Sequence, residues 1–236
     1  MLDKACYNGF MVKVKKGGRR INNAKKMSFH DLFILYLNGE LKLERWQKVG
    51  IFLLVWVIAG FVGWVYEFLA AFIETGEAYM QGGNLLPWIN IYAFGAILVI
   101  PFTYKFRKYP WAVFLISVIA TGLVELIGGW LVYTVGNGVR YWNYDHGWWA
   151  WGSINGFVCP LSVTIFGMQS LALIYLILPV CVYLATRAKK RVFLAVAGTL
   201  FALVMADEAV NLTLKNLNQP TAMDLYRDLG WEYQEF

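Results

Sequence analysis

Residues 59–67 read AGFVGWVYE and lie inside an apolar run, residues 49–73, whose one charged residue is Glu67. On a helix, residues three and four positions apart share a face, so Gly60, Gly63, Trp64 and Glu67 form one stripe. The run is long enough to cross a bilayer, where a carboxylate near the centre costs roughly 2.5–3.5 kcal/mol on insertion scales. Glu67 is therefore a candidate functional residue.

The composition predicts an integral membrane protein. Of the 236 residues, 59% are hydrophobic and 15% are charged, whereas about 25% are charged in an average soluble domain. We expect an all-α, polytopic helical protein with about five membrane-spanning helices, over residues 49–73, 87–104, 111–135, 168–185 and 192–212. The apolar segment before the fourth of these, residues 155–167, contains Pro160 and Gly167 and predicts a broken or re-entrant element.

Polar segments flank this transmembrane domain, which we place at residues 49–213. Residues 1–28 are a predicted basic cytoplasmic tail, and residues 29–48 a predicted amphipathic helix on the inner leaflet. Ser28 is its expected N-cap, with Asp31 where a capping box has its acceptor. Residues 214–236 are a predicted extracytoplasmic tail.

Basic residues predict the orientation of the spans. Eighteen of the 21 Lys and Arg precede the first span or lie between spans 2 and 3 or spans 4 and 5. Cytoplasmic loops carry such an excess, so we expect a multi-pass protein of the cell (inner) membrane, with a cytoplasmic N-terminus and an extracytoplasmic C-terminus. The net charge of +6 then reflects topology rather than nucleic-acid binding, and the lipid bilayer is the expected partner.

A second acid in a predicted span, Glu125, repeats the pattern of Glu67. Thr121, Gly122, Gly128 and Gly129 lie on the same side of its helix. Small residues let helices approach closely, so the two stripes are expected to face each other or a shared cavity. Two interpretations carry about equal weight: each acid makes one interhelical hydrogen bond, or both act on a substrate or ion.

The loop of residues 136–153 is rich in aromatic residues, among them Trp142 and Tyr144, next to Asp145 and His146. Aromatic faces and carboxylates together favour an organic cation, although Trp and Tyr also collect at membrane interfaces without binding a ligand. His146 is a poor metal ligand candidate, because the one other histidine, His30, lies on the opposite side. We expect no metal site and no cofactor.

Other features argue against an enzyme. The three cysteines have no C-x-x-C spacing, and the sequence contains no P-loop, H-E-x-x-H or G-x-S-x-G motif. Asp207 and Glu208 are interpreted as marking the outer end of the last span. Any ATP hydrolysis would therefore require a separate ATPase subunit.

Several stretches, in order, resemble the CmpB-like family of type IV ABC-transporter permeases. They are GWVYE at 63–67, NIYAFG at 90–95, Glu125 with GW at 129–130, WNY at 142–144, NGFVC at 155–159 and FG at 166–167. The chain departs from the family pattern where Asn90 replaces a proline, Ala93 a glycine and Asn143 an acid, and where Tyr133 occupies the place of a second glutamate. The resemblance implies a polytopic permease.

The leading hypothesis is a permease or transporter component that binds a small, cationic solute between spans 1 and 3. Its predicted binding residues are Glu67, Glu125, Trp64, Tyr92, Trp142, Tyr144 and Asn155. The ATPase subunit would dock on residues 29–48. The alternative is a membrane scaffold, sensor or pore-forming effector that acts as a homo-oligomer through its small-residue stripes.

Overall fold

The computed structural model describes residues 15–16, 19–20, 27–138, 140 and 142–233 of the chain. Within the predicted basic tail it describes two short strands, β1 (Lys15–Lys16) and β2 (Arg19–Arg20), which pair antiparallel. The rest of residues 1–26 lies outside the described residues, so the prediction of a tail there is not tested.

The protein is helical, as the sequence predicts. Its helices are α1 (Phe29–Asn38), α2 (Arg45–Thr75), α3 (Asn90–Thr103), α4 (Pro110–Val135), α5 (Pro160–Ala172), α6 (Leu178–Arg187), α7 (Lys190–Asn216) and α8 (Ala222–Asp228). Among the described residues, four helical segments are long and apolar enough to cross a membrane, with mean hydropathies between 1.8 and 2.3: α2, α4, the continuous segment from α5 to α6, and α7. The all-α polytopic prediction is confirmed.

The second predicted span is shorter than the sequence indicates. The helix α3 begins at Asn90 rather than at Pro87 and runs into the short 3-10 helix η2 (Tyr104–Phe106). Residues 82–89 are not helical, because the backbone N–H groups of Leu85 and Leu86 donate to Asp207 on α7 instead of to a helix of their own. Trp88 in this segment is only 2% exposed and packs near Trp56 of α2.

The break expected within residues 155–167 is confined to the residues before Pro160. Pro160 occupies the first turn of α5, where its missing N–H leaves no intrahelical bond unmade. The helix continues through the π-helical turn η4 (Leu173–Ile177) into α6, so the predicted re-entrant element and fourth span form one helix. The π-helical turn closes with the N–H of Leu178, which donates to Leu173 O. Pro179, the next residue, has no N–H to donate. The carbonyl of Ile174 instead accepts from the Tyr36 hydroxyl at 3.0 Å.

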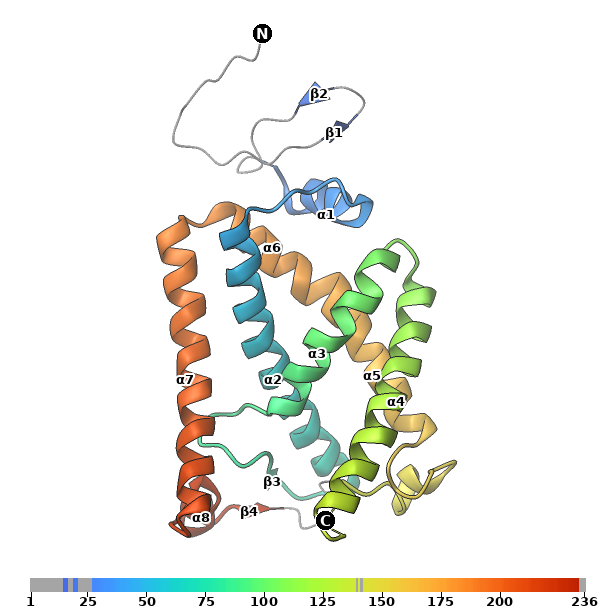
Figure 1. Cartoon of the computed structure of the whole chain (residues 1–236), viewed down its shortest axis with the longest axis vertical. Helices are drawn as coiled ribbons and strands as arrows, with labels where there is room; N and C mark the ends of the chain where they lie inside the picture. The colour runs from blue at the N-terminus through green and yellow to red at the C-terminus, as the bar shows by residue number, and fades with distance from the viewer. Residues whose placement is uncertain (1–14, 17–18, 21–26, 139, 141, 234–236) are drawn as a thin grey trace.

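The predicted amphipathic segment 29–48 divides into α1 and the first residues of α2. Ser28 caps α1 as predicted, since its hydroxyl accepts from the N–H of Asp31 at 3.1 Å. Gly39 ends the helix in the left-handed conformation, with a φ of 74°. Figure 1 shows α1 lying across one end of the helix bundle. Its buried residues Leu32 and Tyr36 belong to the hydrophobic core of the bundle.

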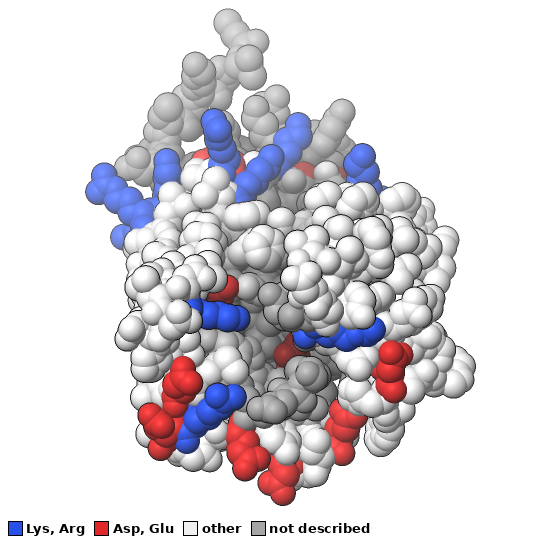
Figure 2. Space-filling model, turned by 60° about the horizontal axis from the view of Figure 1, so that its bottom comes forward, with Lys and Arg blue, Asp and Glu red and all other residues white. Residues whose placement is uncertain are grey.

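The long helices form a bundle with α1 and α8 at opposite ends (Figure 1). The helix α2 packs against α3, α6 and α7, whereas α4 packs against α5 and α3. After α8, the short strand β4 (Glu232–Tyr233) pairs in parallel with β3 (Tyr79–Met80). Lys and Arg side chains gather mainly at the α1 end and Asp and Glu mainly at the other (Figure 2), as expected if the α1 end faces the cytoplasm.

Candidate functional site

Glu125 is the buried acid of the bundle. It lies on α4, is 8% exposed, and both of its carboxylate oxygens are bonded. The Tyr144 hydroxyl donates to Oε1 at 2.7 Å, and the Ser162 hydroxyl lies 2.8 Å from Oε2. Tyr144 comes from the loop after α4, and Ser162 from the first turn of α5. Three segments of the chain therefore meet at this carboxylate.

The Ser162 hydroxyl has one proton but two acceptors in reach. Its Oγ lies 2.8 Å from Glu125 Oε2 and 2.9 Å from the carbonyl oxygen of Cys159. If Glu125 is ionised, Ser162 donates to it; if Glu125 is protonated, the acid donates to Ser162, which then donates to Cys159. The same contacts can therefore accommodate either protonation state of Glu125.

Tyr144 acts in this site as a neutral donor. Burial, together with the negative charge of Glu125, raises the pKa of the Tyr144 phenol well above its usual value. The phenol therefore keeps its proton and holds the loop on Glu125. Its ring also lies 5.5 Å from that of Trp149, which covers it from the loop side.

Glu67, the other acid, is half-buried on α2 and has the side chain of Tyr92 as its hydrogen-bond partner. Tyr66, the residue before it, lies close enough to interact electrostatically with both Glu67 and Glu125. The rings of Tyr66 and Tyr92 are 6.0 Å apart. The two acids thus border one cluster of tyrosines that extends from α2 and α3 to Tyr144 in the loop after α4.

The glycines of α2 position Tyr92. A Cβ atom added at Gly63 would lie 2.1 Å from Tyr92 Cγ, and one at Gly60 would lie 2.1 Å from Trp88 Nε1. Only a residue without a side chain leaves room for these rings. The α2 stripe therefore packs against α3, whereas Gly129 of the α4 stripe packs against Phe157. The two stripes were expected to face each other or a shared cavity. The glycines named here contact different partners, and Tyr66 interacts electrostatically with both acids.

The loop from α4 to α5 is closed by a tight turn at Asn155 and Gly156, which have φ values of 52° and 71°. The N–H of Ile154 donates to Val158 O at 2.8 Å across this turn. Asn-Gly suits a turn that needs positive φ at both positions. The carbonyl of Asn155 accepts from Arg140 at 2.7 Å, while its side chain is exposed.

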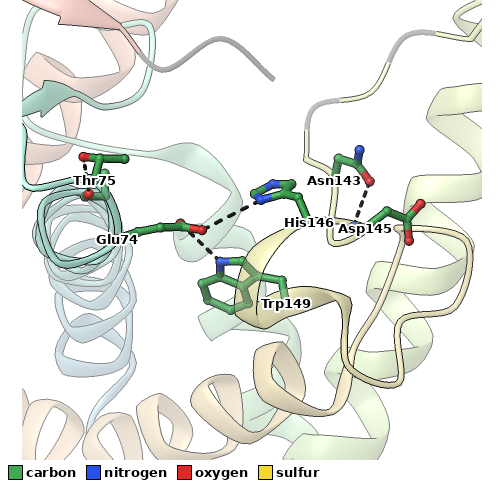
Figure 3. Close-up of polar contacts among 7 residues, drawn as sticks. Glu74, Thr75, Asn143, Asp145, His146 and Trp149 are labelled. Carbon is green, nitrogen blue, oxygen red and sulfur yellow. Dashed lines mark hydrogen bonds and ion pairs between the residues drawn. The ribbon is translucent and has the colours of Figure 1, made fainter.

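The loop is also joined to the end of α2. Figure 3 shows the Glu74 side chain directed at His146 and Trp149, which belong to the loop and the 3-10 helix η3 (Gly147–Ala150). Trp149 Nε1 donates to Glu74 Oε2 at 3.3 Å, and His146 Nδ1 lies 3.8 Å from Glu74 Oε1. These contacts join the loop that carries Tyr144 to the end of the helix that carries Glu67.

The structure brings together four of the seven predicted site residues: Glu67, Glu125, Tyr92 and Tyr144. The other three have different contacts. Trp64 donates to Gln81 O at 3.1 Å and stacks on Phe68, Trp142 donates to Phe157 O at 2.9 Å, and Asn155 forms the turn described above. A role in binding remains a prediction for all seven.

Sequence reasoning did not select Tyr66 and Ser162. A signal for Ser162 was present, because Pro160 is favoured at the start of a helix and Cys159 and Ser162 cap each other across its first turn. If Pro160 is interpreted as the start of a helix, Ser162 lies in the first turn of α5, next to the loop that carries Tyr144. Tyr66 adjoins Glu67, but the sequence has no sign that it comes close enough to Glu125 to interact with it electrostatically.

Asp207 and Glu208 form a separate polar cluster on α7. Asp207 accepts from the backbone N–H of Leu85 at 3.1 Å and of Leu86 at 2.6 Å, and Glu208 accepts from the side chains of Asn84 and Asn90 at 2.7 and 2.8 Å. The pair fastens the segment before α3 to α7. Over the part of the chain that the structure describes, no three His, Cys, Asp or Glu residues form a group that could hold a metal ion.

The long apolar helices and the carboxylates bonded between them define the protein as a polytopic helical membrane protein with a polar centre. Over residues 54–212 the chain matches the family ABC_trans_CmpB, described as "Putative ABC-transporter type IV". The match covers more than half of the chain, so the chain belongs to this family, and the resemblance noted in its motifs is confirmed. Comparisons with curated proteins and with solved structures gave no match. The family description is of transporter type.

Proposed function

We propose that the chain is the membrane-spanning component of a transporter and that it binds a small organic cation at Glu67 and Glu125. The observation that carries this proposal is that carboxylates from two spanning helices border one tyrosine cluster. Acids inside a membrane are costly and commonly mark ion or substrate paths. Aromatic faces add attraction for a cation. Trp64, Trp142 and Asn155 remain proposed contributors from the rim of the site.

Solute entry requires the loop to move. The Tyr144 hydroxyl occupies Glu125 Oε1, so an ammonium group that binds this oxygen replaces Tyr144. The contacts of Glu74 with His146 and Trp149 then break as the loop lifts from the end of α2. The cost of exposing the acid is offset by the charge of the solute.

Energy for transport would come from a separate ATPase subunit. The sequence has no P-loop, so ATP would be hydrolysed on another polypeptide that docks at the α1 end. A docked subunit would act on the helix of the site through α1, because Tyr36 of α1 is bonded to Ile174 in the helix that begins near Ser162.

The test is binding of radiolabelled tetramethylammonium to the purified full chain in detergent, followed by uptake into proteoliposomes that contain its ATPase. Glu67→Gln and Glu125→Gln are each expected to weaken binding at least tenfold. Glu77→Gln is the matched control, because Glu77 is an exposed acid of the neighbouring loop. Binding equal to wild type in both site variants, at normal expression, would refute the proposal.

The competing hypothesis is an oligomeric scaffold, sensor or pore. Its structural support is Gly128 of α4: a Cβ atom added there has no described atom within 4 Å, so this face is open to lipid or to another copy. Disulfide crosslinking of Gly128→Cys in membranes distinguishes the two, with wild type as the control for the native cysteines. A covalent dimer specific to Gly128→Cys supports the oligomer, and its absence supports a binding core within one chain.

A further inference from the structure

An apolar groove opens at the corner where α3 passes through η2 into α4, at the α1 end of the bundle (Figure 1). Its volume is about 370 Å³, within the range of about 300–1,000 Å³ typical of small-molecule sites. The lining residues are Phe106, Tyr109, Trp111, Ala112, Leu115 and Ile116. Tyr109 and Trp111 are 54% and 67% exposed, so the groove faces outward from the bundle and not toward Glu125.

The turn that forms the groove also carries two available cations. Lys105 and Lys108 are exposed, and neither forms an ion pair with any residue that the structure describes. Arg107 between them differs, because it is buried and its guanidinium donates to the carbonyls of Tyr36 and Tyr104. The two lysines therefore remain for a partner outside the chain.

An apolar groove formed by a turn that also carries two exposed lysines is complementary to an anionic lipid. Trp and Tyr favour the membrane interface, which Tyr109 and Trp111 would occupy at the mouth of the groove. Beyond Leu115, the exposed residues Ile119 and Leu123 continue the apolar surface along α4. A chain that enters the groove can thus follow α4 toward the bilayer centre while its headgroup stays near the lysines.

We propose that this groove binds an acyl chain of an anionic phospholipid and that Lys105 and Lys108 bind its phosphate. The site lies in the leaflet at the basic end of the bundle, which is the leaflet where anionic lipids are enriched if that end is cytoplasmic. The proposal does not depend on transport or on the Glu67 and Glu125 site.

The test measures binding of fluorescent phosphatidylglycerol to the purified full chain in neutral detergent. Each lysine is expected to contribute about fivefold in affinity, the equivalent of about 1 kcal/mol, so the double variant Lys105→Gln/Lys108→Gln should bind about 30-fold more weakly. Lys189→Gln/Lys190→Gln is the matched control, because it removes two exposed lysines from the other basic turn at the same end. Thermal unfolding confirms that both variants are folded.

Two further arms separate the acyl chain from the phosphate. Leu115→Trp, which fills the groove, should weaken phosphatidylglycerol binding about tenfold, whereas Leu203→Trp on the exposed face of α7 should not. Soluble glycerol 3-phosphate should not compete. Equal losses in the two lysine double variants, no effect of Leu115→Trp, or competition by glycerol 3-phosphate would each overturn the proposal of a lipid site.

Discussion

Arg107 is predicted to hold α1 on the helix bundle. Its Nε donates to the carbonyl of Tyr36 at 2.6 Å, and its guanidinium carbon lies 4.0 Å from the ring centroid of Tyr104. Tyr36 is in the last turn of α1, where the helix dipole favours a positive charge. The substitution Arg107→Met removes the charge and the donors while keeping an unbranched apolar chain.

The expected magnitude follows from these contacts. A hydrogen bond to a charged group contributes about 1.5–3 kcal/mol, a cation over an aromatic ring about 0.5–2 kcal/mol, and the helix end about 0.3–1 kcal/mol. Such contributions are not additive, and Met keeps part of the packing of Arg107. We expect α1 to be held about 3 kcal/mol less tightly, which raises its undocked fraction on the order of 100-fold.

Hydrogen–deuterium exchange with mass spectrometry measures this directly on the full chain in detergent. Amides of residues 29–41 should exchange up to about 100-fold faster in Arg107→Met, because local opening of α1 exposes them. Amides within residues 50–70 should exchange as in wild type, because α2 keeps its contacts with α3 and α7.

Arg45→Met is the control, since Arg45 is an exposed arginine at the start of α2 and its loss should leave α1 protected. Protection of residues 29–41 in Arg107→Met equal to that of wild type would refute the reasoning. Equal acceleration in the two variants would also refute it, because it would assign the effect to the net charge of this end.

Two other substitutions test the packing of α3. Gly63→Ala should lower the free energy of unfolding by about 1–3 kcal/mol, seen as a lower melting temperature, because its Cβ would overlap the Tyr92 ring. Gly95→Ala, where a Cβ meets no atom within 4 Å, should be neutral or stabilising by up to about 1 kcal/mol. Equal effects of the two substitutions would contradict this packing. Asp207→Ala should lower the free energy of unfolding by about 2 kcal/mol, because two backbone N–H groups lose a charged acceptor. It should also speed hydrogen–deuterium exchange of the amides within residues 82–89. Unchanged exchange there would show that Asp207 does not hold this segment.

The sequence predicted the spanning helices well where local patterns specify them. The runs that became α2, α4 and α7 were found to within a few residues, and the Ser28 cap was correct. It was less informative where a distant residue determines the backbone. The segment before α3 is not helical because Asp207, more than 100 residues away, accepts its N–H groups. Pro160 was interpreted as a break within the membrane, although a proline is equally suited to the first turn of a helix.

The candidate site was predicted in part. Glu67 and Glu125 could be selected because a single acid inside an apolar span is visible in the local sequence, and such an acid needs a compensating partner. Of the residues around these acids, Tyr92 and Tyr144 were predicted, whereas Tyr66 and Ser162 were missed. Ser162 reaches Glu125 because α5 packs antiparallel on α4 at a register that brings residues 37 positions apart into contact, and no short motif records that register.

The sequence by itself therefore determined that the chain is an all-α membrane protein, and which acids lie inside its spans. Within a bilayer each helix must satisfy its own backbone hydrogen bonds, so length, apolarity and caps along one segment are enough to specify a span. Only the tertiary structure decided that Tyr66, Tyr92 and Tyr144 connect Glu67 with Glu125. Lateral packing of helices results from many weak contacts and a few hydrogen bonds between distant residues, and these exist only once the helices are assembled.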